Sequence, residues 1–122
     1  MEKTLFKTKT VLLDDETYLN SNFVLDYYIL STDLHYAIGR FKKIYGIEVV
    51  KSYIDSTNNV ITQSSDVKCV TFDKDEIKNF AEILVNGTVT PISLKEIVTD
   101  YIKERDEADK EKNNCSKIEK GA

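Results

Sequence analysis

The chain of 122 residues has the size of one compact domain, since domains most often contain about 100 to 150 residues. Hydrophobic residues make up 41% and charged residues 31%, which excludes collagen-like and fully disordered chains. No apolar run approaches the roughly 20 residues of a membrane-spanning helix, and no secretory signal pattern is present, so we expect a cytoplasmic protein without a membrane partner. The net charge of −4 argues against a general binder of nucleic acid.

The first half of the chain has the composition of β-strands. Residues 4–13 are rich in threonine and aliphatic residues, and residues 23–30 alternate so that one face is wholly apolar. The polar cluster at residues 31–33 is typical of a turn. Residues 60–72 predict a returning strand, and three short polar residues at 64–66 predict a break or bulge within it.

The segment 33–54 fits two patterns. Four apolar residues in its first half have helical spacing, with an N-cap candidate before them and a glycine after them. The segment also alternates as a strand from Phe41 to Ile54, where β-branched and aromatic residues dominate. We expect the strand from Phe41 to Ile54, followed by a polar turn. The sequence does not decide whether residues 33–45, which include the start of this strand, are helical or extended.

The last third of the chain carries two helix signals. Asp73 and Glu76 have the spacing of a capping box, which predicts a helix that ends near Gly87. Ser93 and Glu96 repeat this spacing and predict a second helix. The apolar residues that flank the two boxes would pack as hydrophobic staples, Phe72 with Ile77 and Ile92 with Ile97.

Strands followed by helices indicate an α+β fold. We expect an antiparallel meander of about four strands, with two C-terminal helices packed on one sheet face and the other face open. Residues 1–104 would form this single domain, and residues 105–122 would form a charged tail that is disordered because it has little to bury. Six apolar residues would bury the helices against the sheet: Ile77, Phe80, Leu84, Ile97, Val98 and Tyr101.

Three short apolar and turn motifs can be compared with known families: Tyr27–Leu30, Tyr45–Val49, and Val89–Leu94 followed by Asp100–Ile102. They resemble an uncharacterised family of small proteins from Gram-positive spore-forming bacteria, a domain of unknown function. The resemblance covers roughly residues 23–103. It implies strands first and helices last, and it implies no activity, cofactor or catalytic residue.

Cysteine and histidine are scarce. We expect Cys69 and Cys115 to be free thiols, because disulfides are rare in a reducing compartment, and we expect Cys69 to be buried. His35 is the only histidine, so the spacing of a metal site is missing and neither a metal nor a cofactor is expected. The acidic run 14–16 lacks the alternating ligands of a calcium loop. No catalytic residue is predicted.

One dense basic and aromatic cluster consists of Arg40, Phe41, Lys42, Lys43 and Tyr45. Such a cluster can hold a phosphate backbone and stack a base, but the chain is acidic and has no nucleic-acid fold signature. These five residues are our candidates for partner binding in a small cytoplasmic binding or regulatory protein. We predict that the basic ones serve contact with a partner protein or a second copy, or else solubility as a solvated strand edge. A row of tyrosines on the open sheet face would also suit an interface. Two alternatives stay open: a small enzyme with an unrecognised pocket, based on His35 or Cys69, and a nucleic-acid accessory protein that uses Arg40, Lys42 and Lys43.

Overall fold

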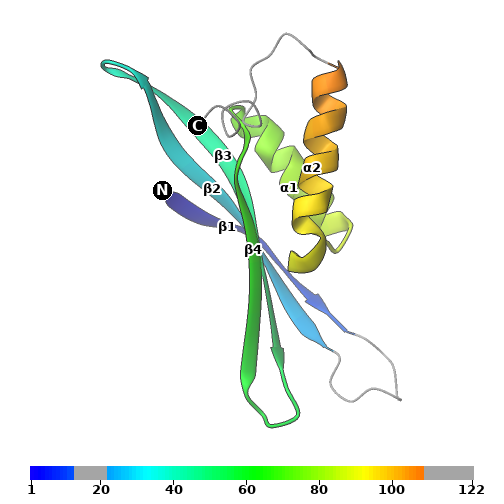
Figure 1. Ribbon diagram of the computed structural model, residues 1–122. Coiled ribbons are helices and arrows are strands. Elements are labelled where there is room, and N and C mark those ends of the chain that lie inside the picture. The colour runs from blue at the N-terminus through cyan, green and yellow to red at the C-terminus, as the bar shows by residue number, and fades with distance from the viewer. Residues whose placement is uncertain (13–21, 109–122) are drawn as a thin grey trace.

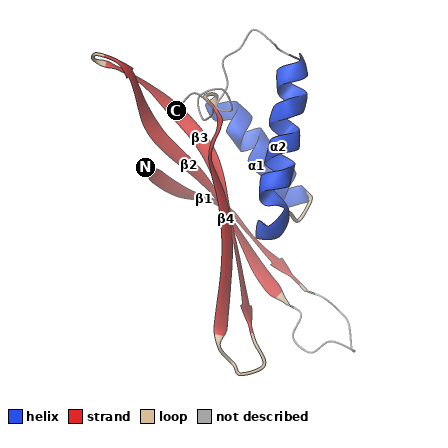
Figure 2. Ribbon diagram, in the orientation of Figure 1, coloured by secondary structure: helices blue, strands red, loops and turns tan. Residues whose placement is uncertain are grey.

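The computed structural model describes residues 1–12 and 22–108. It contains one antiparallel sheet in the order β1-β2-β3-β4, followed by two helices. Figure 1 shows both helices on the same face of the sheet, and Figure 2 shows that the strands extend past the helices at both ends. The predicted α+β meander is confirmed. The elements are β1 (Glu2–Val11), β2 (Phe23–Ala37), β3 (Arg40–Ile54), β4 (Val60–Thr71), α1 (Lys74–Asn86) and α2 (Pro91–Ala108).

The β2–β3 hairpin answers the question left open for residues 33–45. β2 continues to Ala37 and pairs with β3 up to Arg40, so the predicted turn at residues 31–33 is wrong and the helical alternative is excluded. The polar residues there stay in the strand because cross-strand pairing satisfies their backbone groups. The turn lies at Ile38 and Gly39, and Gly39 has φ +71°, a conformation that favours glycine.

The irregularity of β4 lies closer to its end than predicted. Residues 64–66 pair in unbroken register with β3, and the register shifts where Gly46 faces residues 67–71. A Cβ atom on Gly46 would lie within 3 Å of the carbonyl oxygens of Val67 and Lys68. The missing side chain therefore lets the bulged strand approach β3 closely. The bulge predicted near residues 64–66 is therefore present in this strand but begins just after them, since short polar residues are tolerated on this largely exposed part of the strand.

The core lies between the helices and one face of the central strands. Leu25 and Tyr27 of β2 and Val49 of β3 are fully buried there. The rings of Phe80 and Tyr101 join the two helices, with centroids 4.3 Å apart. All six helix residues predicted to bury the pair contact this core: Ile77, Phe80, Leu84 and Val98 are buried, and Ile97 and Tyr101 are half-buried.

The start of α1 agrees in part with the predicted capping box. The Asp73 carboxylate accepts hydrogen bonds from the backbone N–H groups of Asp75 and Glu76 at 2.8 and 3.2 Å, so the N-cap is confirmed. The reciprocal half does not form, because the N–H of Asp73 donates to Thr71 Oγ1 instead. Glu76 is thereby left for contacts with α2. Phe72 packs against a separate small cluster with Ile44.

The start of α2 differs from the prediction. The helix begins at Pro91, and Ser93 lies inside it, with its N–H donating to the carbonyl oxygen of Thr90 at 3.2 Å. Ile92 is 86% exposed, so its staple with Ile97 does not form. The second capping box is therefore wrong. Proline suits the first helical position, where its fixed φ is helical and its missing N–H needs no partner.

Candidate functional site

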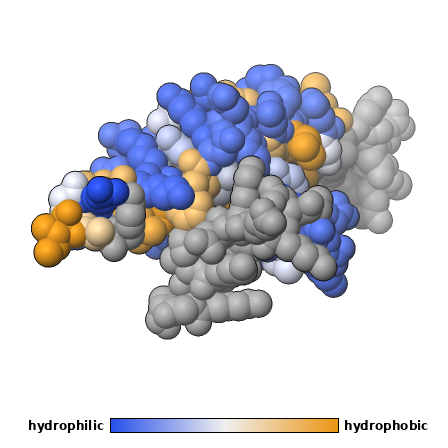
Figure 3. All heavy atoms as spheres, turned by 90° about the horizontal axis from the view of Figure 1, so that it is seen from above, coloured by the Kyte–Doolittle hydropathy of each residue, from blue (hydrophilic) through white to orange (hydrophobic). Residues whose placement is uncertain are grey.

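The hairpin arm, defined as residues 32–43 of β2 and β3, extends beyond the helices at the upper left of Figure 1. Its tip carries Ile38, which is 99% exposed, and next to it Phe41, which is 64% exposed. Phe41 stacks on His35 of the opposite strand, with ring centroids 4.8 Å apart. Arg40 follows the turn and is exposed. In Figure 3 the projecting left end shows hydrophobic and strongly hydrophilic atoms side by side.

Strand alternation divides the predicted partner-binding residues between the two faces of the sheet. Phe41, Lys43 and Tyr45 lie on the face that carries the helices. Lys42 lies on the other face, where its Nζ atom is 4.3 Å from the centroid of the Phe72 ring. The cluster that is continuous in sequence is therefore not one patch, because the side-chain period of two separates its lysines.

A cleft of about 400 Å³ lies at the base of the arm, between the sheet and the first turns of α1. We call it the lysine cleft, because Lys43 of β3 and Lys74 and Lys78 of α1 all line it. The sequence did not single out the two α1 lysines, since they are more than 30 residues away from Lys43. The rest of the lining combines hydroxyl, carboxylate and apolar side chains: Glu2, Thr4, Leu5, Phe6, Ile29, Ser31, Tyr45 and Ile77.

The cations of the lysine cleft have few partners. The Nζ atom of Lys43 lies 3.7 Å from the carboxylate of Asp33, directly across the hairpin. Among the described residues, no ion pair or hydrogen bond engages the ammonium groups of Lys74 and Lys78. These two lysines are four residues apart on α1, so they share a helix face and repel each other. The cleft thus has an excess of positive charge.

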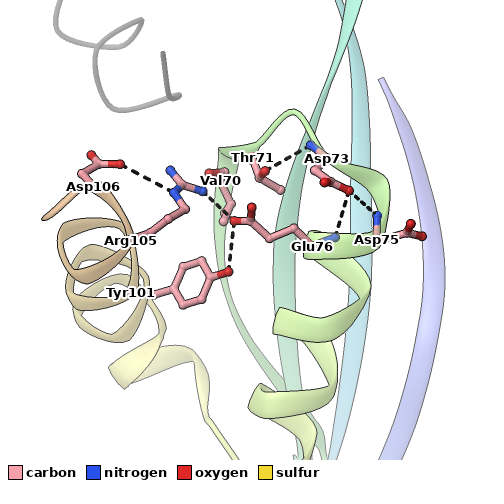
Figure 4. A network of polar contacts seen from close by, with 8 residues as sticks. All are labelled: Val70, Thr71, Asp73, Asp75, Glu76, Tyr101, Arg105 and Asp106. Atoms are coloured by element: carbon pink, nitrogen blue, oxygen red, sulfur yellow. Dashed lines mark hydrogen bonds and ion pairs between the residues drawn. The ribbon is translucent and has the colours of Figure 1, made fainter. Parts of the chain in front are cut away.

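A second polar cluster joins both helices to β4 (Figure 4). Glu76 Oε2 accepts hydrogen bonds from the Tyr101 hydroxyl at 3.0 Å and from Arg105 Nη1 at 2.8 Å, and Arg105 also donates to the Val70 carbonyl oxygen. Burial, assisted by the hydrogen bond to Glu76, raises the pKa of Tyr101 to about 12. Because the acid and the phenol satisfy each other, this cluster stabilises the packing of the two helices.

The same cluster shows that α2 continues past the expected domain boundary at residue 104. Arg105 is half-buried through its contacts with Glu76 and Val70, and the helix ends at Ala108. The remainder of the predicted disordered tail, residues 109–122, lies outside the described residues.

The two side chains considered for an enzyme do not form a pair. His35 stacks on Phe41 in the arm, whereas Cys69 packs with Ile44 in the separate small cluster. Cys69 is 6% exposed, as predicted, but it is disulfide-bonded, so the expectation of two free thiols is wrong. That expectation rested on the rarity of disulfides in a reducing compartment, and such an argument does not consider which cysteines lie close together in the folded chain. Cys115 itself lies outside the described residues.

The sheet face opposite the helices does not carry a row of tyrosines among the described side chains. Tyr27 and Tyr45 lie on the helix side. Tyr28 lies on the opposite face, with Lys3 Nζ 4.3 Å from its ring centroid, and Lys3 also pairs with Glu48. The side chains of this face therefore interact with one another, and an interface built on tyrosines has no support there.

Residues 1–12 and 22–108 contain no group of three or more histidine, cysteine or acidic side chains that could hold a metal ion. The acidic run 14–16 lies outside this range. No described helix has the length and apolar character needed to cross a membrane. A second cavity, of about 460 Å³, lies between the ends of β2, β3 and β4 near Asn22, where the described chain resumes.

Comparison with protein families identifies one match. Residues 2–104, which include the whole sheet, α1 and most of α2, match a family of unknown function. No curated protein and no solved structure matches the chain. The three motifs indicated an uncharacterised family, and this match agrees with that expectation. The chain belongs to the family of unknown function DUF6514.

Proposed function

We propose that this protein is a small binding or regulatory protein whose hairpin arm contacts a partner protein. The observation that carries the proposal is the exposure of Ile38 and Phe41 at the end of a projecting hairpin. Neither side chain belongs to the core, so neither exposure is explained by folding. Aromatic and arginine side chains are enriched in protein interfaces, and the tip combines Phe41 with Arg40.

The arm is well suited to this role because it is ordered by strand pairing. Its residues pair across the hairpin from Thr32 with Ile44 to Ala37 with Arg40, with one irregularity after His35. A paired hairpin holds its side chains in a fixed register before any partner arrives. Less conformational entropy is then lost on binding, which favours affinity.

The charge of the arm indicates the character of the partner. Arg40, Lys42 and Lys43 surround the apolar tip, and Asp33 is paired with Lys43. A protein surface with an apolar pocket and acidic side chains around it would be complementary. Because the chain has a net charge of −4, a second copy would also offer acidic groups to the arm. The cross-linking experiment below distinguishes such self-association from binding of a separate protein.

The nucleic-acid alternative receives less support from this geometry. Lys42 lies on the face opposite Lys43, so the three basic residues do not line one groove. A cytoplasmic location and an origin in Gram-positive spore-forming bacteria stay predictions from the sequence.

The proposal is tested by photo-crosslinking in a nuclease-treated native cell extract. A photoreactive amino acid is placed at position 38 and, as a matched control, at position 92, because Ile38 and Ile92 are both highly exposed isoleucines. We expect position 38 to cross-link to one defined protein and position 92 not to. Phe41→Ser combined with Arg40→Ser should abolish this product.

The other outcomes are equally distinct. A cross-link to a second copy of the chain would replace a separate partner by self-association. Equal cross-linking at positions 38 and 92, or none at either, would contradict the proposed role of the arm. A product that is present only without nuclease would favour the nucleic-acid alternative.

A further inference from the structure

We propose that the lysine cleft binds a small organic phosphate, meaning a ligand with one phosphate group and an apolar body. This site is separate from the exposed tip of the hairpin arm, and it does not depend on the proposed protein contact. Its volume of about 400 Å³ lies in the range of small-molecule sites, which is about 300 to 1,000 Å³. Strands β1, β2 and β3 and helix α1 all contribute to its lining.

Lysines that lie further along the same helix–sheet interface have partners, whereas two lysines of the cleft do not. Lys7 of β1 forms an ion pair with Glu82 of α1 at 2.9 Å, and Lys9 donates to oxygen atoms at the end of α1. Lys74 and Lys78, in the first turns of the same helix, have no such partner among the described residues. Along the contact between β1 and α1, the lysines without a partner are therefore those that line the cleft.

Lys74 and Lys78 occupy electrostatically unfavourable positions on α1. Cations in the first turns of a helix are disfavoured by the helix dipole, and like charges four residues apart repel. The Glu76 carboxylate in the same turn is held by Arg105. The charged residues that line the cleft are three lysines and one glutamate. A bound anion would offset both unfavourable terms, and lysine is a common phosphate ligand.

The rest of the lining provides hydroxyl groups and an apolar wall. The hydroxyl groups of Ser31 and Tyr45 form no hydrogen bond with other described residues, and both side chains are half-buried. They are available to donate to phosphate oxygens beside the lysines. Phe6 and Ile29 are half-buried and Ile77 is buried, so the same cleft has an apolar wall. A ligand that uses both parts needs an anionic group and an apolar body.

The experiment measures binding of three probes to the full chain by isothermal titration calorimetry and by NMR. The probes are phenyl phosphate, inorganic phosphate and phenol, which separate the contributions of the charge and of the apolar body. We expect phenyl phosphate to bind most tightly, inorganic phosphate more weakly and phenol not measurably. Amide shifts should be concentrated at residues 29–31, 43–45 and 74–78.

Variants then test the lysines. Lys74→Gln combined with Lys78→Gln should weaken phenyl phosphate binding by about tenfold or more, since two charge-assisted contacts are lost. Lys95→Gln is the matched control, because Lys95 is an exposed lysine on α2 that does not line the cleft. Ile38→Ser in the arm should also leave binding unchanged, so a failure of the arm proposal does not affect this one.

Three results would overturn the inference. One is the absence of saturable binding of phenyl phosphate at millimolar concentration. Another is equal affinity of the double lysine variant and the Lys95→Gln control. The third is equal binding of phenol and phenyl phosphate, which would make the cleft an apolar site only. An unchanged thermal midpoint of the double variant shows that a loss of binding is not a loss of folding.

Discussion

The middle of the sheet and its hairpin end belong to the same two strands, but they use their side chains differently. In the middle, Tyr27 is fully buried and its hydroxyl donates to the Val89 carbonyl oxygen at 2.9 Å. At the hairpin end Ile38 is exposed, and in the cleft at the base of the hairpin Lys74 and Lys78 of α1 lack partners among the described residues. The middle therefore stabilises the fold, whereas the hairpin end and the cleft expose apolar and charged groups that the core does not use.

The largest expected effect of a substitution lies in the middle. Phe80→Ala should lower the free energy of unfolding by about 3 to 5 kcal/mol, because it removes a fully buried ring between the helices and leaves a cavity. Ile83→Ala on the exposed side of α1 should cost under about 1 kcal/mol. Urea unfolding measures both. A loss below 1 kcal/mol for Phe80→Ala would place the ring outside the core.

A smaller but still large effect is expected where the two regions meet. Gly46→Ala should lower the free energy of unfolding by about 1 to 3 kcal/mol, since the added methyl group would overlap the β4 backbone. Gly87→Ala is the control, because the nearest atom to its new methyl group would be 3.4 Å away. If chemical denaturation shows the same stability for both variants, the close approach of β4 at Gly46 is not needed.

The hydroxyl of Tyr27 should contribute less. Tyr27→Phe leaves the Val89 carbonyl oxygen without its donor and should cost about 1 to 2 kcal/mol at neutral pH. Burial raises the pKa of Tyr27 to about 12, so the phenol stays neutral in the folded chain when the unfolded chain ionises near 10. The contribution of the neutral Tyr27 phenol to the free energy of unfolding is then fully present below pH 10 and is lost as the pH rises toward 12.

Tyr101 contributes to the same pH dependence, because burial and Glu76 raise its pKa to about 12 as well. Urea unfolding at several alkaline pH values should show a shallower loss of stability for Tyr27→Phe than for the native chain, with Tyr101 accounting for part of the remainder. An identical pH dependence of both proteins would mean that the Tyr27 hydroxyl is not buried.

The smallest effect is expected at the arm. Ile38→Ser and Phe41→Ser should each change the free energy of unfolding by less than about 0.5 kcal/mol, because neither side chain packs in the core. A thermal melt of each variant measures this. A drop of several degrees would show that the tip packs on the body of the protein, and the contrast between the two regions would then be lost.

Local patterns were sufficient for much of the fold. The alternation of β2, the helical stripe that contains Phe80, and the Asp73 N-cap were all predicted, because each depends on residues within a few positions of one another. The arm residues Phe41 and Lys43 were also predicted as partner-binding candidates, since their composition is visible in the sequence. The separation of Lys42 from Phe41 and Lys43, on opposite faces of the sheet, follows from the strand period once the strand is known.

The sequence by itself therefore determined the α+β order, the buried helix faces and the first helix cap, all of which rest on short-range spacing. Only the tertiary structure decided which partner each polar group takes. Glu76 binds Arg105 of α2 in place of its own helix cap, and Lys43 meets Lys78 of α1 in one cleft. No local pattern contains these pairings, because hydrogen bonds and charges act between atoms that only the folded backbone brings together.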